Sequence, residues 1–230
     1  MCSRTVRTKK KNLNPSSTFN YHSDQPKKLR VPFLYEESYQ WFTSFDDLGE
    51  IIERPNPTPA IQYLSKIIQH LINDCSWQMN HIHLFGFAQG GSVATEFVID
   101  LSKQQQLRIK KSIDSNNVSQ GLEPREPVPS LGSIVTVSGP LLSYPTISNL
   151  CPTPILVTHR SPPSDMALPP GAFIAFNKAF ASVTESKMET KGMGMPSSKQ
   201  EWDPIMQFWS QHLARRQVEG LYEVMSGSGN

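Results

Sequence analysis

Residues 83–92 hold the side chains with the clearest chemical pattern, an apolar run that passes through a Gly-x-x-x-Gly turn into a helical pattern. In a Gly-x-Ser-x-Gly nucleophile elbow, the central residue sits on a strained strand-to-helix turn, and the flanking glycines clear space around it. Here the central residue is Ala88, between Gly86 and Gly90. A methyl group has no proton to lose and no lone pair with which to attack, so this turn cannot form an acyl-enzyme by the usual route. The first question is therefore whether the chain is an enzyme at all.

The segments around this turn follow the order that an elbow requires. Apolar residues recur at helical spacing over residues 61–72, after three loop-breaking prolines, which predicts an amphipathic helix that ends near Trp77. Residues 81–87 then form a short strand-like run, and residues 91–101 return to helical spacing. A strand, a glycine turn and a helix are therefore expected in succession.

Further strands and helices are expected after residue 130. Residues 133–137 and 155–158 are short, β-branched and bounded by Gly or Pro, as buried parallel strands often are. Helices are expected over residues 171–183 and 199–216. The alternation predicts an α/β fold with a mostly parallel sheet flanked by helices.

Length and cysteine usage narrow the class of protein. A chain of 230 residues can bury one sizeable core, so one domain over residues 30–216 is expected, with residues 102–130 as a mobile insertion and 217–230 as a flexible tail. No run of about 18 apolar residues and no secretory signal occurs, so we expect a cytoplasmic protein without a membrane span. Cys2, Cys75 and Cys151 are odd in number and far apart. This favours unpaired thiols, with neither a metal site nor a cofactor.

The first thirty residues carry a strong positive charge. They hold eight Lys and Arg against one acid, Asp24, whereas the rest of the chain holds fourteen against nineteen. Three interpretations of residues 1–29 stay open: a disordered, solvated leader, a nuclear-import or nucleic-acid patch, or a transit peptide. The disordered leader is favoured, so nucleic acid is not the expected partner, and the nucleus is the alternative location.

The elbow resembles that of a known family. The acyl-protein thioesterase and carboxylesterase branch of the α/β-hydrolases carries Gly-Phe-Ser-Gln-Gly-Gly, which this chain matches in all but the nucleophile with Gly86-Phe87-Ala88-Gln89-Gly90-Gly91. Two weaker matches are Val137-Ser138-Gly139, at a strand end, and Trp41-Phe42, at the family's Trp-Phe pair. The resemblance covers roughly residues 30–216. It implies an α/β-hydrolase fold, an oxyanion donor at the Gln89 amide, and Trp41 and Phe42 near an acyl pocket.

The same resemblance locates the acid and the base. Asp165 lies at the position of the triad acid, and Met195 replaces the histidine of the family's Gly-Met-Gly-His segment. A thioether cannot shuttle a proton, so the triad fails at two of its three positions. His159, at the end of an expected strand, is interpreted as a locally bonded residue and not as a replacement base.

The family's opening segment is not recognisable in this chain. That segment contains a strand and a Leu-His-Gly-x-Gly-Asp-like turn that supplies a second oxyanion donor, and no His-Gly pair occurs here. The N-terminal strands are therefore expected to be missing or replaced, which would leave a sheet edge for a protein partner to cover. A truncated gene model would give the same appearance.

Three functions remain open at this point. The favoured one is a pseudo-hydrolase that binds an acyl or ester ligand or a protein partner. The second is an active carboxylic ester or palmitoyl-protein thioester hydrolase with an unidentified nucleophile. The third is a nucleic-acid-linked role of the basic leader.

Overall fold

The computed structural model describes residues 39–115, 129–145, 149–164, 166–189 and 194–213, with no account of the side chains of 112–115. The expected leader, the C-terminal tail and residues 116–128 of the expected insertion lie outside this description. The elements are α1 Thr58–Asn73, a 3-10 helix Met79–His81, β1 His83–Phe87, α2 Gln89–Ser115, β2 Ser133–Val137, β3 Ile155–Arg160, α3 Ala172–Ala179, β4 Val183–Met188 and α4 Lys199–His212.

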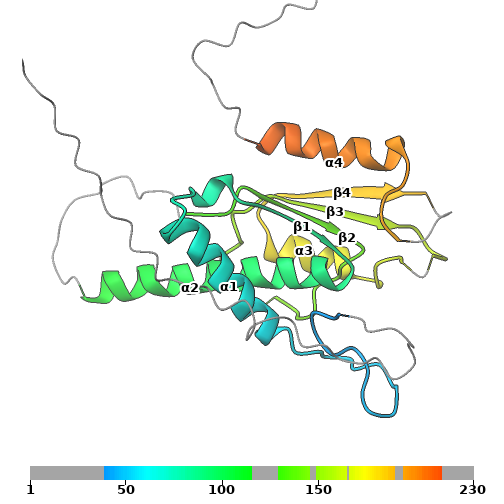
Figure 1. The fold of residues 1–230 in the computed structure, drawn as a ribbon, viewed down its shortest axis with the longest axis horizontal. Coiled ribbons are helices and arrows are strands. Elements are labelled where there is room, and N and C mark those ends of the chain that lie inside the picture. Colours follow the sequence, from blue (N-terminus) through cyan, green and yellow to red (C-terminus); the bar gives the residue numbers. More distant parts are fainter. Residues whose placement is uncertain (1–38, 116–128, 146–148, 165, 190–193, 214–230) are drawn as a thin grey trace, which may run out of the picture.

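The four strands form one parallel sheet in the order β1-β2-β3-β4. Helices α1, α2 and α3 lie on one face of this sheet, and α4 covers the other (Figure 1). The predicted α/β fold, with a mostly parallel sheet flanked by helices, is confirmed.

Two hydrophobic layers hold the sheet between the helices. One face of β2 and β3 contributes Ile134, Ile155 and Val157, which pack with Phe97 of α2 and Phe176 of α3. The opposite face contributes Val135, Val137 and Leu156, which pack with Ile205 and Phe208 of α4. Because both faces are covered, every residue of β2 and β3 is buried, as is usual for central parallel strands.

Two elements differ from the sequence-based expectation. Helix α2 continues to Ser115, so the first part of the expected mobile insertion is helical. Gln, Lys and Arg are good helix formers, and the Gln104 amide donates to Asp100 Oδ2 at 2.6 Å, one turn earlier. Helical propensity therefore extends α2 beyond residue 101, where the helical spacing of apolar residues ends.

Strand β4 was not predicted, and helix α3 ends at Ala179 instead of Val183. The sequence of β4 is Val-Thr-Glu-Ser-Lys-Met, which lacks the apolar run of β2 and β3. Charged residues are typical of an edge strand, where one side has no neighbour. The pairing with β3 that creates this strand depends on tertiary structure and leaves little local signal.

At the opposite edge, β1 pairs with β2 alone among the described residues. The expectation that the family's N-terminal strands are missing or replaced concerns residues 1–38, which lie outside the description. No described helix combines the length and apolar character needed to cross a membrane. All four strands are parallel, so their carboxyl ends lie on one side of the sheet. The segments that follow the four strands therefore meet there.

Candidate functional site

The backbone at Ala88 has the conformation of a nucleophile elbow. Its φ is 47°, in the left-handed region, between the last residue of β1 and the first residue of α2. The Ala88 amide donates to Val137 O at 2.8 Å, and Ala88 O accepts from Ser92 N at 3.0 Å. Left-handed backbone costs an L-residue roughly 1–2 kcal/mol, and such strain gathers at functional sites. The turn is therefore formed as the motif predicts, with a methyl group where the nucleophile would stand.

The glycines around Ala88 allow the helix to approach the sheet closely. A Cβ at Gly86 would lie 2.5 Å from the backbone of Gly90 and Gly91, and one at Gly91 would lie 2.4 Å from Thr136 Oγ1. A Cβ at Gly139 would lie 2.6 Å from Ala88 O. Real Cβ atoms do not approach so near, so the start of α2 depends on these glycines to rest on the ends of β1 and β2.

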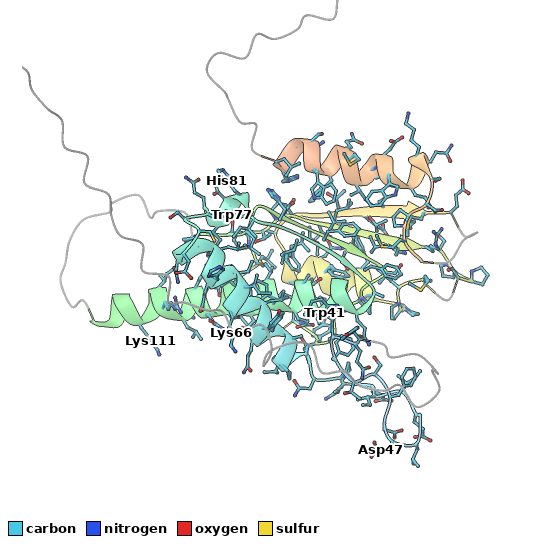
Figure 2. All side chains as sticks on the ribbon, viewed as in Figure 1. Trp41, Asp47, Lys66, Trp77, His81 and Lys111 are labelled. Atoms are coloured by element: carbon cyan, nitrogen blue, oxygen red, sulfur yellow. The ribbon has the colours of Figure 1, made fainter. Side chains whose placement is uncertain are left out.

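Gln89 joins the elbow to a segment more than forty residues earlier. Its side-chain Oε1 accepts from Trp41 N at 3.0 Å, and its Nε2 donates to Ser44 Oγ at 2.7 Å and to Phe42 O at 3.3 Å. Figure 2 shows Trp41 beside the beginning of α2. The sequence suggested Gln89 only for its backbone amide. The hydrogen bonds of its side chain could not be predicted, because their partners lie far away along the chain.

The resemblance implies that the Gln89 amide is an oxyanion donor. As the first residue of α2, Gln89 has an N–H without an intrahelical partner, and the described residues offer it no recorded acceptor. Such an amide can bind a partial negative charge near Ala88. The family's second donor would come from residues outside the description.

A second strained residue follows β2, next to the elbow. Ser138 has a φ of 55°, and its amide donates to Thr158 O at 2.8 Å. The hydroxyls of Ser138 and Thr158 are buried, and neither has a hydrogen-bond partner among the described residues. The strand-end Ser-Gly pair marked this place in the sequence, but its positive φ and its orphan hydroxyl were not predicted.

The base position lies in a loop that we define as the base loop, residues 194–198. Gly194 has a φ of 87°, and Met195 after it is 37% exposed. The loop is held by the Trp202 indole, which donates to Pro196 O at 3.0 Å, and by Ser197 N, which donates to Glu201 Oε2 at 2.8 Å. Gly192, Met193 and the expected acid Asp165 lie outside the described residues, so the arrangement of the three expected triad positions stays a prediction.

A buried ion pair supports the base loop from the sheet. Arg160 Nη1 donates to Glu201 Oε1 at 2.7 Å and to Glu189 O at 2.8 Å, and the Arg160 side chain is 1% exposed. Burial alone would raise the pKa of Glu201, but the Ser197 amide and Arg160 outweigh it, so that the pKa lies below its ordinary value. This pair was missed, although the Ser198-x-x-Glu201 capping pattern at the start of α4 was visible in the sequence.

Three described histidines are bonded away from Ala88. The His159 ring lies 3.0 Å from Arg160 O and 2.9 Å from Glu185 Oε1, which confirms the expected local bonding. His83 bonds Ser133 Oγ at 2.8 Å, and burial and the nearby His212 and His81 lower its pKa. His212 bonds Phe208 O at 2.8 Å, near the end of α4. Each of these three rings is thus engaged in a local hydrogen bond.

Known proteins share this architecture. A curated relative, the uncharacterized hydrolase UM10204 of Mycosarcoma maydis, is 31% identical over 189 residues, which are 82% of this chain and 63% of the relative. The crystal structure of Arabidopsis thaliana SOBER1 matches with a TM-score of 0.51 and 19% identity, over 78% of this chain and 76% of that one. A variant of SOBER1 matches with a TM-score of 0.50 and 18% identity, over 77% and 76%. The chain has the α/β-hydrolase fold.

The fold implied by the resemblance at the elbow is thereby confirmed. No protein-family model matches the chain. The chain spans 63% of the length of the curated relative, somewhat less than two thirds. The activity of the whole protein is therefore a matter of proposal.

Proposed function

We propose that this α/β-hydrolase-fold chain is a catalytically degenerate carboxylesterase or acyl-protein thioesterase, in which the elbow serves binding instead of turnover. The observation that carries this proposal is Ala88 at a φ of 47° inside a complete elbow. The close approach of the glycines and the two backbone hydrogen bonds of Ala88 support this proposal, because they surround a methyl group where the elbow motif has its nucleophile. Met195 at the base position adds a second loss.

The chemistry of the described groups supports binding more than hydrolysis. Acyl transfer by a serine hydrolase needs an alkoxide, a base that accepts its proton, and donors for the developing oxyanion. Ala88 cannot attack, Met195 cannot accept a proton, and the Gln89 amide is one donor. An acyl or ester carbonyl could still bind that amide, because binding needs the donor and not the nucleophile. The ligand that would bind the Gln89 amide is thus a carbonyl-containing group, either on a small molecule or on a protein partner.

An active hydrolase with a different nucleophile is the second candidate. The buried hydroxyls of Ser138 and Thr158 favour it, since neither has a partner among the described residues. Ser138 follows Val137, which accepts a hydrogen bond from the Ala88 amide, and Thr158 pairs with Val137 from the next strand. Each would still need a base, and His83, His159 and His212 are bonded elsewhere. The nucleic-acid alternative concerns the leader, outside the described residues. It requires salt-dependent binding that disappears when residues 1–30 are removed.

The proposal is tested with a fluorophosphonate probe and with short-chain aryl esters and thioesters. We expect no stoichiometric labelling and no hydrolysis above that of heat-inactivated protein. A Ser138→Ala variant serves as the control for the second candidate. Labelling of the parent that disappears in Ser138→Ala would overturn the proposal in favour of that serine.

Restoring the nucleophile gives an independent test. We expect Ala88→Ser alone to show no turnover, because the base loop offers Met195 where a histidine should accept the proton. The double variant Ala88→Ser with Met195→His should gain weak esterase activity, with Ala88→Ser and Met195→Gln as the matched control. Multiple turnovers by Ala88→Ser alone would show that a base exists near the elbow.

A further inference from the structure

The C-terminal end of α1 carries three reactive side chains in contact with one another. His70 Nδ1 lies 2.5 Å from Asp74 Oδ2, and His70 Nε2 lies 3.9 Å from Cys75 Sγ. The imidazole therefore has a carboxylate on one nitrogen and a thiol on the other. This is the order of an orienting acid, a base and a nucleophile.

The local fold places these groups by the way in which α1 ends. His70 and Asp74 are one turn apart on the helix, so their side chains meet on one face. The amides of Asp74 and Cys75 both donate to His70 O, at 2.9 Å and 3.2 Å, and Ser76 then takes a left-handed φ of 58°. This helix end turns the chain back toward its last turn and holds Cys75 beside His70.

The cluster is exposed and separate from the elbow. The side chains of His70 and Asp74 are 37% and 62% exposed, and Cys75 is exposed. Figure 2 shows Trp77 and His81, which follow Cys75 closely in the chain, near the end of α1 that points away from Trp41. Among the described residues no group of three or more His, Cys, Asp or Glu side chains is arranged to hold a metal ion. The trio is therefore not explained by metal binding or by the elbow.

We propose that Cys75 is a site of thiol–disulfide exchange with low-molecular-weight disulfides, with His70 as its base and Asp74 as the group that orients His70. The Cys75 thiol gives its proton to His70 Nε2, and the thiolate attacks one sulfur of the disulfide. A new bond joins Cys75 to that sulfur, the original S–S bond breaks, and the released thiolate takes the proton from the imidazolium. The products are a mixed disulfide on Cys75 and one free small thiol.

Disulfide exchange fits this site better than acyl transfer. Acyl transfer builds negative charge on a carbonyl oxygen, which needs donors in place. The amides of Asp74, Cys75 and Trp77 already donate to carbonyls of α1. In disulfide exchange the charge passes from one sulfur to another and needs no oxyanion hole.

The chain contains its own contrast to Cys75. Cys151 is 1% exposed, and burial raises the pKa of its thiol. A thiol in that setting is protonated and closed to solvent, so it should not react in the folded protein. Peptide mapping assigns an adduct to Cys75, Cys151 or Cys2, because the three cysteines lie far apart in the sequence.

The test is exposure of the full chain to oxidised glutathione near neutral pH, followed by intact mass and peptide mapping. We expect one glutathione on Cys75, removable by dithiothreitol, and none on Cys151. The His70→Gln variant should react on the order of tenfold more slowly, which is less than the roughly 10²–10⁴-fold typical of general-base catalysis because the S–N distance of 3.9 Å is long. Asp74→Asn should slow the reaction by a smaller factor, and His81→Gln, which alters an exposed histidine outside the cluster, should leave it unchanged.

Repeating the four measurements in concentrated urea gives the reference for an unactivated thiol. There the rates at Cys75 should become equal, because the helix end that joins the groups is lost. Equal rates for the parent and His70→Gln in the folded state would overturn the proposal. So would an adduct on Cys75 that dithiothreitol does not remove.

Discussion

The elbow and the base loop both lie at the carboxyl ends of the strands, but different interactions hold them in place. The elbow is held by backbone packing, in which Gly86 and Gly91 let α2 touch the strands and Ala88 accepts a strained φ. The base loop is held by polar side chains, with Arg160 and Glu201 buried beneath it and Trp202 bonded to Pro196. Neither set of contacts includes a reacting atom.

This difference determines which substitutions each of the two regions tolerates. The elbow glycines are required by the approach of α2 to β1, whatever side chain stands at residue 88. The Arg160–Glu201 pair likewise holds the loop whether its second residue is methionine or histidine. The contacts described for the two regions therefore do not require a reactive side chain at residue 88 or residue 195.

The largest effect is expected from Gly86→Ala, which attacks the packing of the elbow. The new Cβ would lie 2.5 Å from the backbone of Gly90 and Gly91, and backbone atoms cannot rotate away. We expect a loss above the roughly 1–3 kcal/mol typical of overpacking, measured as the free energy of unfolding in urea.

Gly90→Ala is the matched control in the same turn. Its Cβ would lie 3.3 Å from the Trp41 indole nitrogen, which belongs to a partly exposed side chain that can shift. Alanine also favours the helix by about 1 kcal/mol over glycine, so the net change should stay within about 1 kcal/mol. Equal losses for the two variants would mean that the elbow is not packed as described.

The base loop should respond to Glu201→Gln by a smaller amount. The amide keeps an acceptor for Arg160 but leaves a buried positive charge without its carboxylate. We expect a loss of roughly 2–3 kcal/mol at neutral pH, as for a charged hydrogen bond. Urea unfolding of both proteins at equal ionic strength gives the measurement, and no loss would show that the pair does not support the loop.

The same pair predicts a pH dependence that the elbow should not share. The pKa of Glu201 is lowered in the folded state, so its contribution is present above the ordinary value near 4.5 and is lost as pH falls toward the folded value. The stability difference between the parent and Glu201→Gln should therefore shrink below about pH 4.5. The difference between the parent and Gly90→Ala should stay constant over the same range.

The sheet and the elbow could be predicted from sequence because their signals are local. Short β-branched runs marked β2 and β3, and the spacing of Gly86, Gly90 and Gly91 fixed the turn at Ala88. Strand β4 escaped because its identity depends on pairing with β3, and its own sequence is polar. The end of α2 escaped because helical propensity, without apolar spacing, extends it.

The contacts that position the site are mostly long-range. Gln89 bonds residues 45 to 48 positions away, and Arg160 bonds Glu201 at a separation of 41. Only folding brings such partners together, so motif spacing could locate Ala88 and Met195 but not what holds them. The positive φ of Ser138 could not be predicted either, because a serine at a strand end does not indicate a left-handed backbone.

The smallest effect, and the sharpest test of the elbow, is expected from Ala88→Gly. Glycine would remove the roughly 1–2 kcal/mol that left-handed backbone costs alanine, but it would also loosen the unfolded chain by about 0.4–1 kcal/mol. The net result should lie between no change and a gain of about 1.6 kcal/mol. Ala175→Gly in α3, where φ is helical, should instead lose about 1 kcal/mol. Urea midpoints at unchanged m-value decide the matter, and a loss in Ala88→Gly equal to that in Ala175→Gly would mean that residue 88 lies in a relaxed turn.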